Sequence, residues 1–182
     1  MNFLYEDFNN YCNSLNVKVS EYCIFVSIYE QKLYLFKNNF LLESFVVSTS
    51  LAPESCIENS FGTPLGLHCV ADKIGEGEDI DTVFVARKAV GRISDYPENA
   101  QNLITTRIMR LRGLEQGRNL GGNCDTYNRY VYIHGTNKVS ELGTRFSKGC
   151  VVLSPKDMLR LYDLVAENTL VYLKGGISKN CF

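Results

Sequence analysis

Two short strand-forming runs, each adjoining a reactive side chain, constrain this sequence more than any other feature. Residues 129–133 lead into His134, and residues 150–153 begin with Cys150. Runs of this length that are rich in β-branched and aromatic residues predict strands. We therefore expect a β-rich scaffold that holds both reactive side chains at strand ends, on a rigid frame.

The pairing of this cysteine with this histidine predicts nucleophilic chemistry. A cysteine attacks as its thiolate, and neutral histidine is the side chain best suited to take the thiol proton near neutral pH. Gly149 leaves the backbone beside Cys150 open, so that N–H groups there can stabilise an oxyanion. We interpret Cys150, His134 and Gly149 as the catalytic residues of an acyl-transfer site. The competing interpretation is a Gly/Ser loop with an incidental histidine and a core cysteine.

The residues around this pair resemble a known signature. H-G-T from His134 and S-K-G-C-V from Ser147 are similar to the motif of the L,D-transpeptidase (YkuD-type) catalytic domain family. Further blocks that fit the same family, in the same order, are residues 26–36, 47–50, 62–66 and 106–111, the glycine-rich loop that follows, and Gly143. The resemblance covers roughly residues 22–174.

Two positions depart from the pattern of that family. Lys148 stands where the family usually has a histidine, and Val152 stands where it often has an arginine. A lysine near the sulfur would still favour the thiolate, because a nearby positive charge lowers a thiol pKa. The family arginine is expected to meet a substrate carboxylate, so Val152 predicts altered binding of the acceptor.

The resemblance implies a mainly β fold with a few helices. The expected architecture is an L,D-transpeptidase (YkuD)-like β-sandwich with one helix after the catalytic cysteine. The expected organisation is an N-terminal helical extension over residues 1–21, a catalytic domain over 22–174 and a C-terminal tail over 175–182. Apolar residues recurring at three- and four-residue steps over residues 3–15 also predict a short amphipathic helix.

The resemblance also implies an activity on peptidoglycan. The expected reaction is L,D-transpeptidation, in which Cys150 forms a thioester on a tetrapeptide stem, D-alanine leaves, and another stem takes up the acyl group. One alternative is an L,D-carboxypeptidase that uses water as the acceptor, and a second is a non-catalytic cell-wall-binding domain. No metal or organic cofactor is required, and carbapenem inhibitors are a further candidate ligand class.

Several residues near the motif are candidates for contact with a substrate. Ser147 and Thr136 could orient either the substrate or the histidine. A purely structural role in a turn is given equal weight for both residues. Arg129 could meet a substrate carboxylate, as could Arg118 in the glycine-rich loop. The full set of substrate-binding candidates is Ser147, Thr136, Lys148, Tyr132 and Arg129. The group that orients His134 stays open, because a backbone carbonyl could serve as well as a carboxylate.

Composition excludes other classes of function. The 182 residues carry a net charge of −1 and no run of Lys or Arg, which argues against nucleic acid as a partner. No apolar stretch approaches the roughly 18 residues of a membrane span. Residues 1–16 do not resemble a secretory signal. The resemblance implies the periplasm or cell envelope, and the cytoplasm stays open; the oligomeric state is not indicated.

His68 and the segment after the motif favour structural roles. His68 lies in a predicted strand without a second histidine or a C-x-x-C nearby, so a half-buried strand histidine is favoured over a zinc ligand. Ser154, Pro155 and Asp157 together predict a helix start, and Asn168 suits its end. This helix follows the cysteine strand closely, so we expect it to brace that strand.

Overall fold

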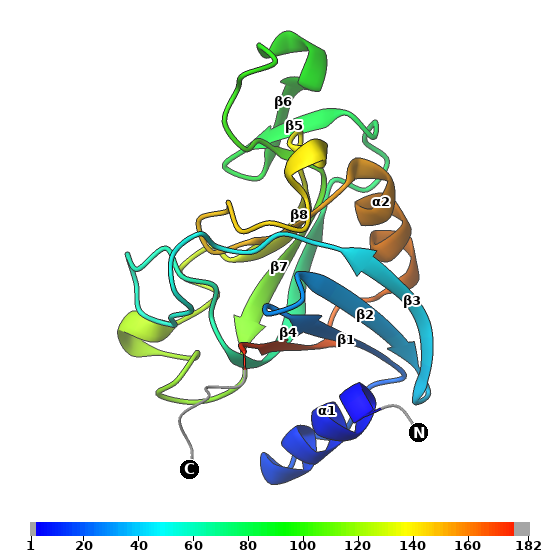
Figure 1. Ribbon diagram of the computed structural model, residues 1–182, viewed down its shortest axis with the longest axis vertical. Helices are drawn as coiled ribbons and strands as arrows, with labels where there is room; N and C mark the ends of the chain where they lie inside the picture. Colours follow the sequence, from blue (N-terminus) through cyan, green and yellow to red (C-terminus); the bar gives the residue numbers. More distant parts are fainter. Residues whose placement is uncertain (1–2, 177–182) are drawn as a thin grey trace.

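The computed structural model describes residues 3–176, which form a mainly β protein with helices at its edges (Figure 1). The α-helices are α1 (Phe3–Ser14) and α2 (Pro155–Leu164), and the strands are β1 (Tyr22–Ser27), β2 (Lys32–Lys37), β3 (Phe40–Val46), β4 (Gly66–Ile74), β5 (Thr82–Val85), β6 (Lys88–Arg92), β7 (Ile104–Gly113), β8 (Tyr132–Gly135), β9 (Val151–Leu153) and β10 (Leu170–Lys174). The predicted fold class is confirmed.

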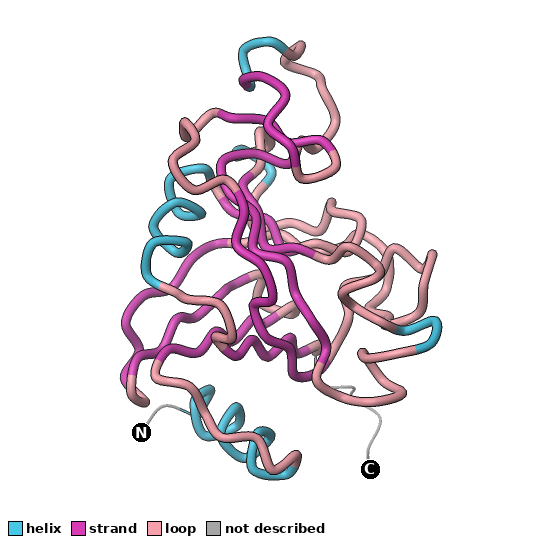
Figure 2. Tube along the Cα trace, turned by 180° about the vertical axis from the view of Figure 1, so that it is seen from behind, coloured by secondary structure: helices cyan, strands magenta, loops and turns pink. Residues whose placement is uncertain are grey.

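The strands belong to one mixed sheet that bends around the core (Figure 2). Its order is β3-β2-β1-β10-β4-β7-β5-β6, and β8 branches from β7 to pair with β9. The pairs β1·β10 and β8·β9 are parallel, whereas the other neighbours are antiparallel. Strand β9 pairs with β8 and also exchanges two backbone hydrogen bonds with Ser48 through Val152, so the position of Cys150 depends on both.

The main core packs the inner sides of the bent sheet against each other and against α2. Ile24 of β1, Ile133 of β8 and Leu161 of α2 belong to one cluster, and each is 0% exposed. Val151 and Leu153 of β9 lie in the same cluster. Removing a buried leucine side chain of this kind costs about 2–5 kcal/mol of stability. The helix was expected to brace the cysteine strand; it packs mainly on β7 and β8, and β9 shares the same core with them.

Helix α2 begins as its sequence predicts. The Ser154 hydroxyl accepts a hydrogen bond from the Asp157 backbone N–H at 3.1 Å, and Pro155 occupies the first helical position. The helix ends at Leu164, so the prediction that Asn168 marks its end was wrong. Asn168 lies in the next turn with φ of 67°, a conformation that asparagine tolerates.

The predicted N-terminal helix is confirmed as α1, which lies against the outer face of the sheet (Figure 1). Phe8 and Cys12 are 0% exposed in a second cluster that includes Tyr172 of β10. Tyr11 stacks on Tyr172 with ring centroids 4.4 Å apart, and its hydroxyl donates to Glu115 at 2.8 Å. The extension is thus packed onto the domain.

The structure adds one hairpin that the sequence did not predict and corrects one predicted boundary. Strand β6 pairs with β5 as an antiparallel hairpin. Residues 129–131 were expected to be strand, yet they form a turn in which the Arg129 N–H donates to the Asp125 carbonyl and Tyr130 has φ of 56°. Within residues 3–176, no helix is long and apolar enough to cross a membrane.

Candidate active site

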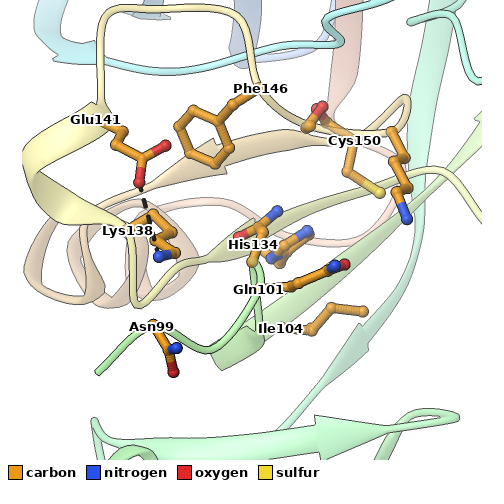
Figure 3. Close-up of a pocket in the computed structure, with 11 residues that line it drawn as sticks. Asn99, Gln101, Ile104, His134, Lys138, Glu141, Phe146 and Cys150 are labelled. Carbon is orange, nitrogen blue, oxygen red and sulfur yellow. Dashed lines mark hydrogen bonds and ion pairs between the residues drawn. The ribbon is translucent and has the colours of Figure 1, made fainter. Parts of the chain in front are cut away.

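The parallel pairing of β8 with β9 brings the predicted histidine and cysteine together. His134 lies opposite Val152, and Cys150 immediately precedes β9. Residues two apart on a strand share a face, so Cys150 projects to the same side as Val152 and its partner His134. Both side chains line one cavity of about 460 Å³ (Figure 3).

Loops supply most of the cavity wall. Residues 99–102 form one side and residues 138–148 form the other. The lining residues are Asn99, Gln101, Asn102, Ile104, His134, Lys138, Glu141, Phe146, Ser147, Lys148 and Cys150. The wall is predominantly polar in residue type, with both signs of charge, which suits a charged peptide better than an apolar ligand.

The orientation of His134 is fixed by the backbone. Its Nδ1 lies 2.7 Å from the carbonyl oxygen of Gly135, which can only accept, so Nδ1 carries the proton. The unprotonated nitrogen is then Nε2, the one available as a base. Burial lowers the pKa of His134 to about 4, and the hydrogen bond to Gly135 acts in the opposite direction by raising this pKa. The imidazole is therefore neutral near pH 7 and ready to accept a proton.

Cys150 is half-buried, and its sulfur faces backbone groups of the neighbouring turn. The Tyr132 N–H donates to Sγ at 3.4 Å, and Sγ lies 3.9 Å from the Tyr130 carbonyl oxygen. Burial raises the pKa of the Cys150 thiol to about 11, while the Tyr132 N–H and the Arg129 charge act in the opposite direction. The resting pair is thus a neutral thiol and a neutral imidazole.

Ser147 holds the turn that presents the cysteine. Its hydroxyl donates to the Cys150 carbonyl at 2.6 Å and accepts the Gly149 N–H at 3.3 Å. Gly149 has φ of 119°, which side chains rarely allow. Ser147 therefore holds the turn of residues 147–150 that presents Cys150. The Gly149 N–H already donates to the Ser147 hydroxyl within this turn.

Three other predicted substrate contacts use their polar atoms inside the protein. Thr136 donates to the Asn102 side chain at 2.6 Å and so tethers the cavity wall. The Tyr132 hydroxyl accepts from Arg87 at 3.2 Å. Arg129 donates to the carbonyls of residues 55 and 62, at 3.0 and 2.8 Å, and so holds the loop between β3 and β4. These contacts are structural.

Lys148 lies at the boundary of two cavities. It lines the cavity of His134 and also a second one of about 290 Å³, which Arg129, Tyr130 and Phe61 line from the other side. The charge that lowers the Cys150 pKa belongs to Arg129. Arg118, the other arginine considered for a substrate, instead pairs with Glu115 at 2.9 Å, far along the glycine-rich loop.

Sequence reasoning missed the charged and amide residues that line the cavity. Lys138 and Glu141 lie on the short 3₁₀ turn after the H-G-T segment, and Asn99 and Gln101 lie in the loop before β7. Loops carry no hydrophobic periodicity, so nothing in the sequence pointed these side chains toward His134.

His68 has a structural role and is fully buried rather than half-buried. Its Nδ1 lies 2.9 Å from the Gly66 carbonyl oxygen and its Nε2 lies 3.0 Å from the Thr126 hydroxyl. It thereby ties β4 to the glycine-rich loop. Between residues 3 and 176 there is no group of three or more Cys, His, Asp or Glu side chains suited to a metal ion.

Comparison with known proteins identifies the same signature over most of the chain. A model described as the L,D-transpeptidase catalytic domain (YkuD) matches residues 21–173. No curated protein matches the sequence significantly.

Solved structures share the fold at low identity. An L,D-transpeptidase from Mycobacterium smegmatis is 20% identical with a TM-score of 0.53, over 85% of this chain and 58% of that chain. The Enterococcus faecium L,D-transpeptidase is 16% identical with a TM-score of 0.52, over 86% and 50%. L,D-transpeptidase 3 from Mycobacterium tuberculosis, in complex with a faropenem-derived adduct, is 14% identical with a TM-score of 0.53, over 85% and 60%. This chain thus spans 50–60% of the length of these structures.

Proposed function

Because the chain belongs to the L,D-transpeptidase catalytic domain family, we propose that it is a peptidoglycan L,D-transpeptidase with Cys150 as nucleophile and His134 as base. The observation that carries this proposal is the shared cavity, in which both side chains project from one face of β8 and β9. The neutral state of His134 and its fixed Nδ1–H further support a base at Nε2.

The first half-reaction transfers the acyl group of a tetrapeptide stem to sulfur. Cys150 Sγ attacks the carbonyl between the diamino acid and D-alanine, and the thiol proton passes to His134 Nε2. The C–N bond then breaks, and the same proton goes to the leaving nitrogen of D-alanine. Since the thiol pKa is raised to about 11, proton transfer accompanies formation of the C–S bond instead of preceding it.

The oxyanion requires a backbone donor beside the sulfur. The Gly149 N–H donates to Ser147, so we assign this task to the Cys150 N–H instead of to Gly149. Gly149 remains necessary because its φ of 119° shapes the turn that carries this N–H. One such donor contributes roughly 3–4 kcal/mol of transition-state stabilisation in comparable sites.

The second half-reaction releases the acyl group from sulfur. An amine from another stem gives a crosslink, and water gives a trimmed stem, which is the L,D-carboxypeptidase alternative. His134 Nε2 takes the proton of either nucleophile as it attacks the thioester. The charged and amide groups of the cavity wall support an amine acceptor with its own charges over bare water.

A cell-wall-binding domain without catalysis is the second alternative. The raised pKa of the Cys150 thiol agrees with an inert structural cysteine. Against that reading, the same residue lines a cavity with a neutral histidine, which a core cysteine would not need. Acylation of Cys150 by a peptide stem therefore separates the two functions.

Two further proposals follow from the family. A structure of L,D-transpeptidase 3 from Mycobacterium tuberculosis carries a faropenem-derived adduct, and another family structure is in complex with imipenem. We propose that carbapenems acylate Cys150 in the same way that a stem does.

Peptidoglycan lies in the cell envelope, and we propose that this enzyme acts there.

Product analysis tests the proposed function. The purified protein is incubated with disaccharide-tetrapeptide, and the products are separated and identified by mass spectrometry. A dimer joined between two diamino acids supports transpeptidation, whereas tripeptide with free D-alanine supports the carboxypeptidase. Unchanged tetrapeptide together with the absence of an acyl-enzyme on Cys150 contradicts both and supports the binding domain.

A further inference from the structure

One pair of opposite charges faces the candidate catalytic residues across the cavity. Lys138 Nζ and Glu141 Oε1 lie 3.7 Å apart, with side chains 23% and 49% exposed. Figure 3 shows this pair on one side of His134, with Cys150 on the other side. We infer that the pair binds the zwitterionic end of an α-amino acid, an inference that rests on the proposed function.

The pair is held in a fixed relation to His134. The backbone N–H of Lys138 donates to the Thr136 hydroxyl at 3.0 Å, and the Glu141 N–H donates to the Lys138 carbonyl at 3.1 Å. Thr136 is in turn hydrogen-bonded to Asn102 on the opposite wall of the cavity. The turn that carries both charges is therefore anchored to the segment that carries the base.

The charged groups retain capacity for a ligand. Their separation of 3.7 Å exceeds a normal hydrogen bond, and neither charged group bonds to any other residue between 3 and 176. Exposed ion pairs contribute only about 0–1 kcal/mol to stability, so a ligand can take up either charge at little cost in folding free energy. An ammonium and a carboxylate fixed side by side match a ligand that carries both charges a short distance apart.

The proposed reaction produces such a ligand at this place. The nitrogen that receives the thiol proton through His134 belongs to D-alanine, whose carboxylate is on the adjacent carbon. D-alanine is released as a neutral amine, which takes one further proton from water and so becomes a zwitterion. The structure assigns the carboxylate to Lys138 and the ammonium to Glu141. No other cation of the cavity lies on this side of His134, because Lys148 adjoins the cysteine at the boundary with the second cavity.

The subsite formed by Lys138 and Glu141 then also selects the acceptor. The amine that attacks the thioester must lose its proton to the same base, so it occupies the place that D-alanine has left. An amine on a carbon that carries a carboxylate satisfies both Lys138 and Glu141. The terminal amine of a lysine stem has no adjacent carboxylate. The chain is therefore expected to prefer acceptors whose side chain ends in an amino acid, such as a diamino dicarboxylic acid.

Binding to the Cys150→Ala protein tests the inference without turnover. D-alanine, D-alaninamide and N-acetyl-D-alanine are compared by ligand-observed NMR titration, because the last two each lack one charge. We expect D-alanine to bind at least tenfold more tightly than either. Adding Lys138→Met should reduce its affinity to that of D-alaninamide, and Glu141→Gln should reduce it to that of N-acetyl-D-alanine. The exposed Lys156, at the start of α2, supplies the matched control Lys156→Met, which should change nothing.

The outcomes separate this inference from the proposed function. Equal affinity for the three ligands, no detectable binding of D-alanine, or a loss caused by Lys148→Met but not by Lys138→Met, would overturn the inference. A protein that prefers D-alanine but leaves tetrapeptide unchanged retains the subsite and contradicts only the proposed activity. A protein that processes stems without this preference contradicts only the subsite.

Discussion

His134 Nδ1 lies 2.7 Å from the carbonyl oxygen of Gly135, so the residue that follows His134 also orients its imidazole. Gly135 in turn packs against an irregular part of β7, where the register with β8 shifts between Thr105 and Ile108. A Cβ atom at position 135 would lie 2.7 Å from Thr106 Oγ1 and 2.8 Å from Thr105 Oγ1. The imidazole is thus positioned through a close approach of two backbones.

Gly135→Ala should impair catalysis more than it impairs folding. The added methyl group must displace β8 from β7, and small misplacements of a catalytic group can cost about 100-fold in rate. We expect kcat to fall by about 10- to 100-fold with KM little changed, measured on tetrapeptide. The matched control is Gly175→Ala, whose Cβ would meet the side chains of Leu65 and Glu54 at ordinary contact distances. Equal rates for the two variants would contradict this positioning.

His134→Ala should lower the rate strongly while the fold remains. General base catalysis by a side chain contributes about 100- to 10,000-fold, and kcat should fall within that range. Circular dichroism and thermal unfolding would check that the variant is folded. A variant with near wild-type turnover would show that another group removes the thiol proton.

Alkylation of Cys150 should depend steeply on pH. Burial raises the pKa of its thiol to about 11, so little thiolate exists near neutrality and the rate should rise about tenfold per pH unit from pH 7 to 10. Iodoacetamide labelling, quantified by mass spectrometry of the Cys150 peptide, measures this dependence. A plateau below pH 8 would instead reveal a thiolate–imidazolium pair in the resting enzyme.

Stability should fall as the pH is lowered from about 6.5 to 4. Burial lowers the pKa of both His68 and His134 to about 4, whereas an unfolded histidine has a pKa near 6.5. Between these values the unfolded chain binds more protons, so stability is complete above pH 6.5 and is lost on acidification, by up to about 3 kcal/mol per histidine.

Urea unfolding at a series of pH values measures this loss. The variant His68→Asn should be less stable throughout, yet it should show a shallower dependence on pH between 5 and 6.5. An unfolding free energy that stays constant from pH 7 to 5 would contradict burial of neutral imidazoles.

The sequence predicted those parts of the fold that local patterns determine. The helix after the cysteine follows from Ser154 and Pro155, and the turn between β2 and β3 follows from Asn38 and Asn39, which have φ of 46° and 69°. The hairpin strand β6 was missed because its residues show no alternation of buried and exposed positions: four of the five are exposed. Propensity alone does not determine such an edge strand.

The proximity of His134 and Cys150 was predictable, but the surrounding cavity was not. His134 and Cys150 carry chemistry that a motif reveals, and their strands fix where they project. Arg129 and Thr136 were interpreted as substrate contacts from their residue types, yet tertiary hydrogen bonds engage both with the protein. The charges of Lys138 and Glu141 reach the cavity only through the folding of loops, which no local pattern reports.

The most direct test of the central claim is the detection of an acyl-enzyme on Cys150. The protein is mixed with disaccharide-tetrapeptide, quenched in acid, and examined by intact mass and by peptide mapping. We predict an added mass equal to that of the stem without D-alanine, attached to the Cys150 peptide and absent from Cys150→Ala. An adduct on another cysteine, or turnover by Cys150→Ala, would contradict Cys150 as the nucleophile.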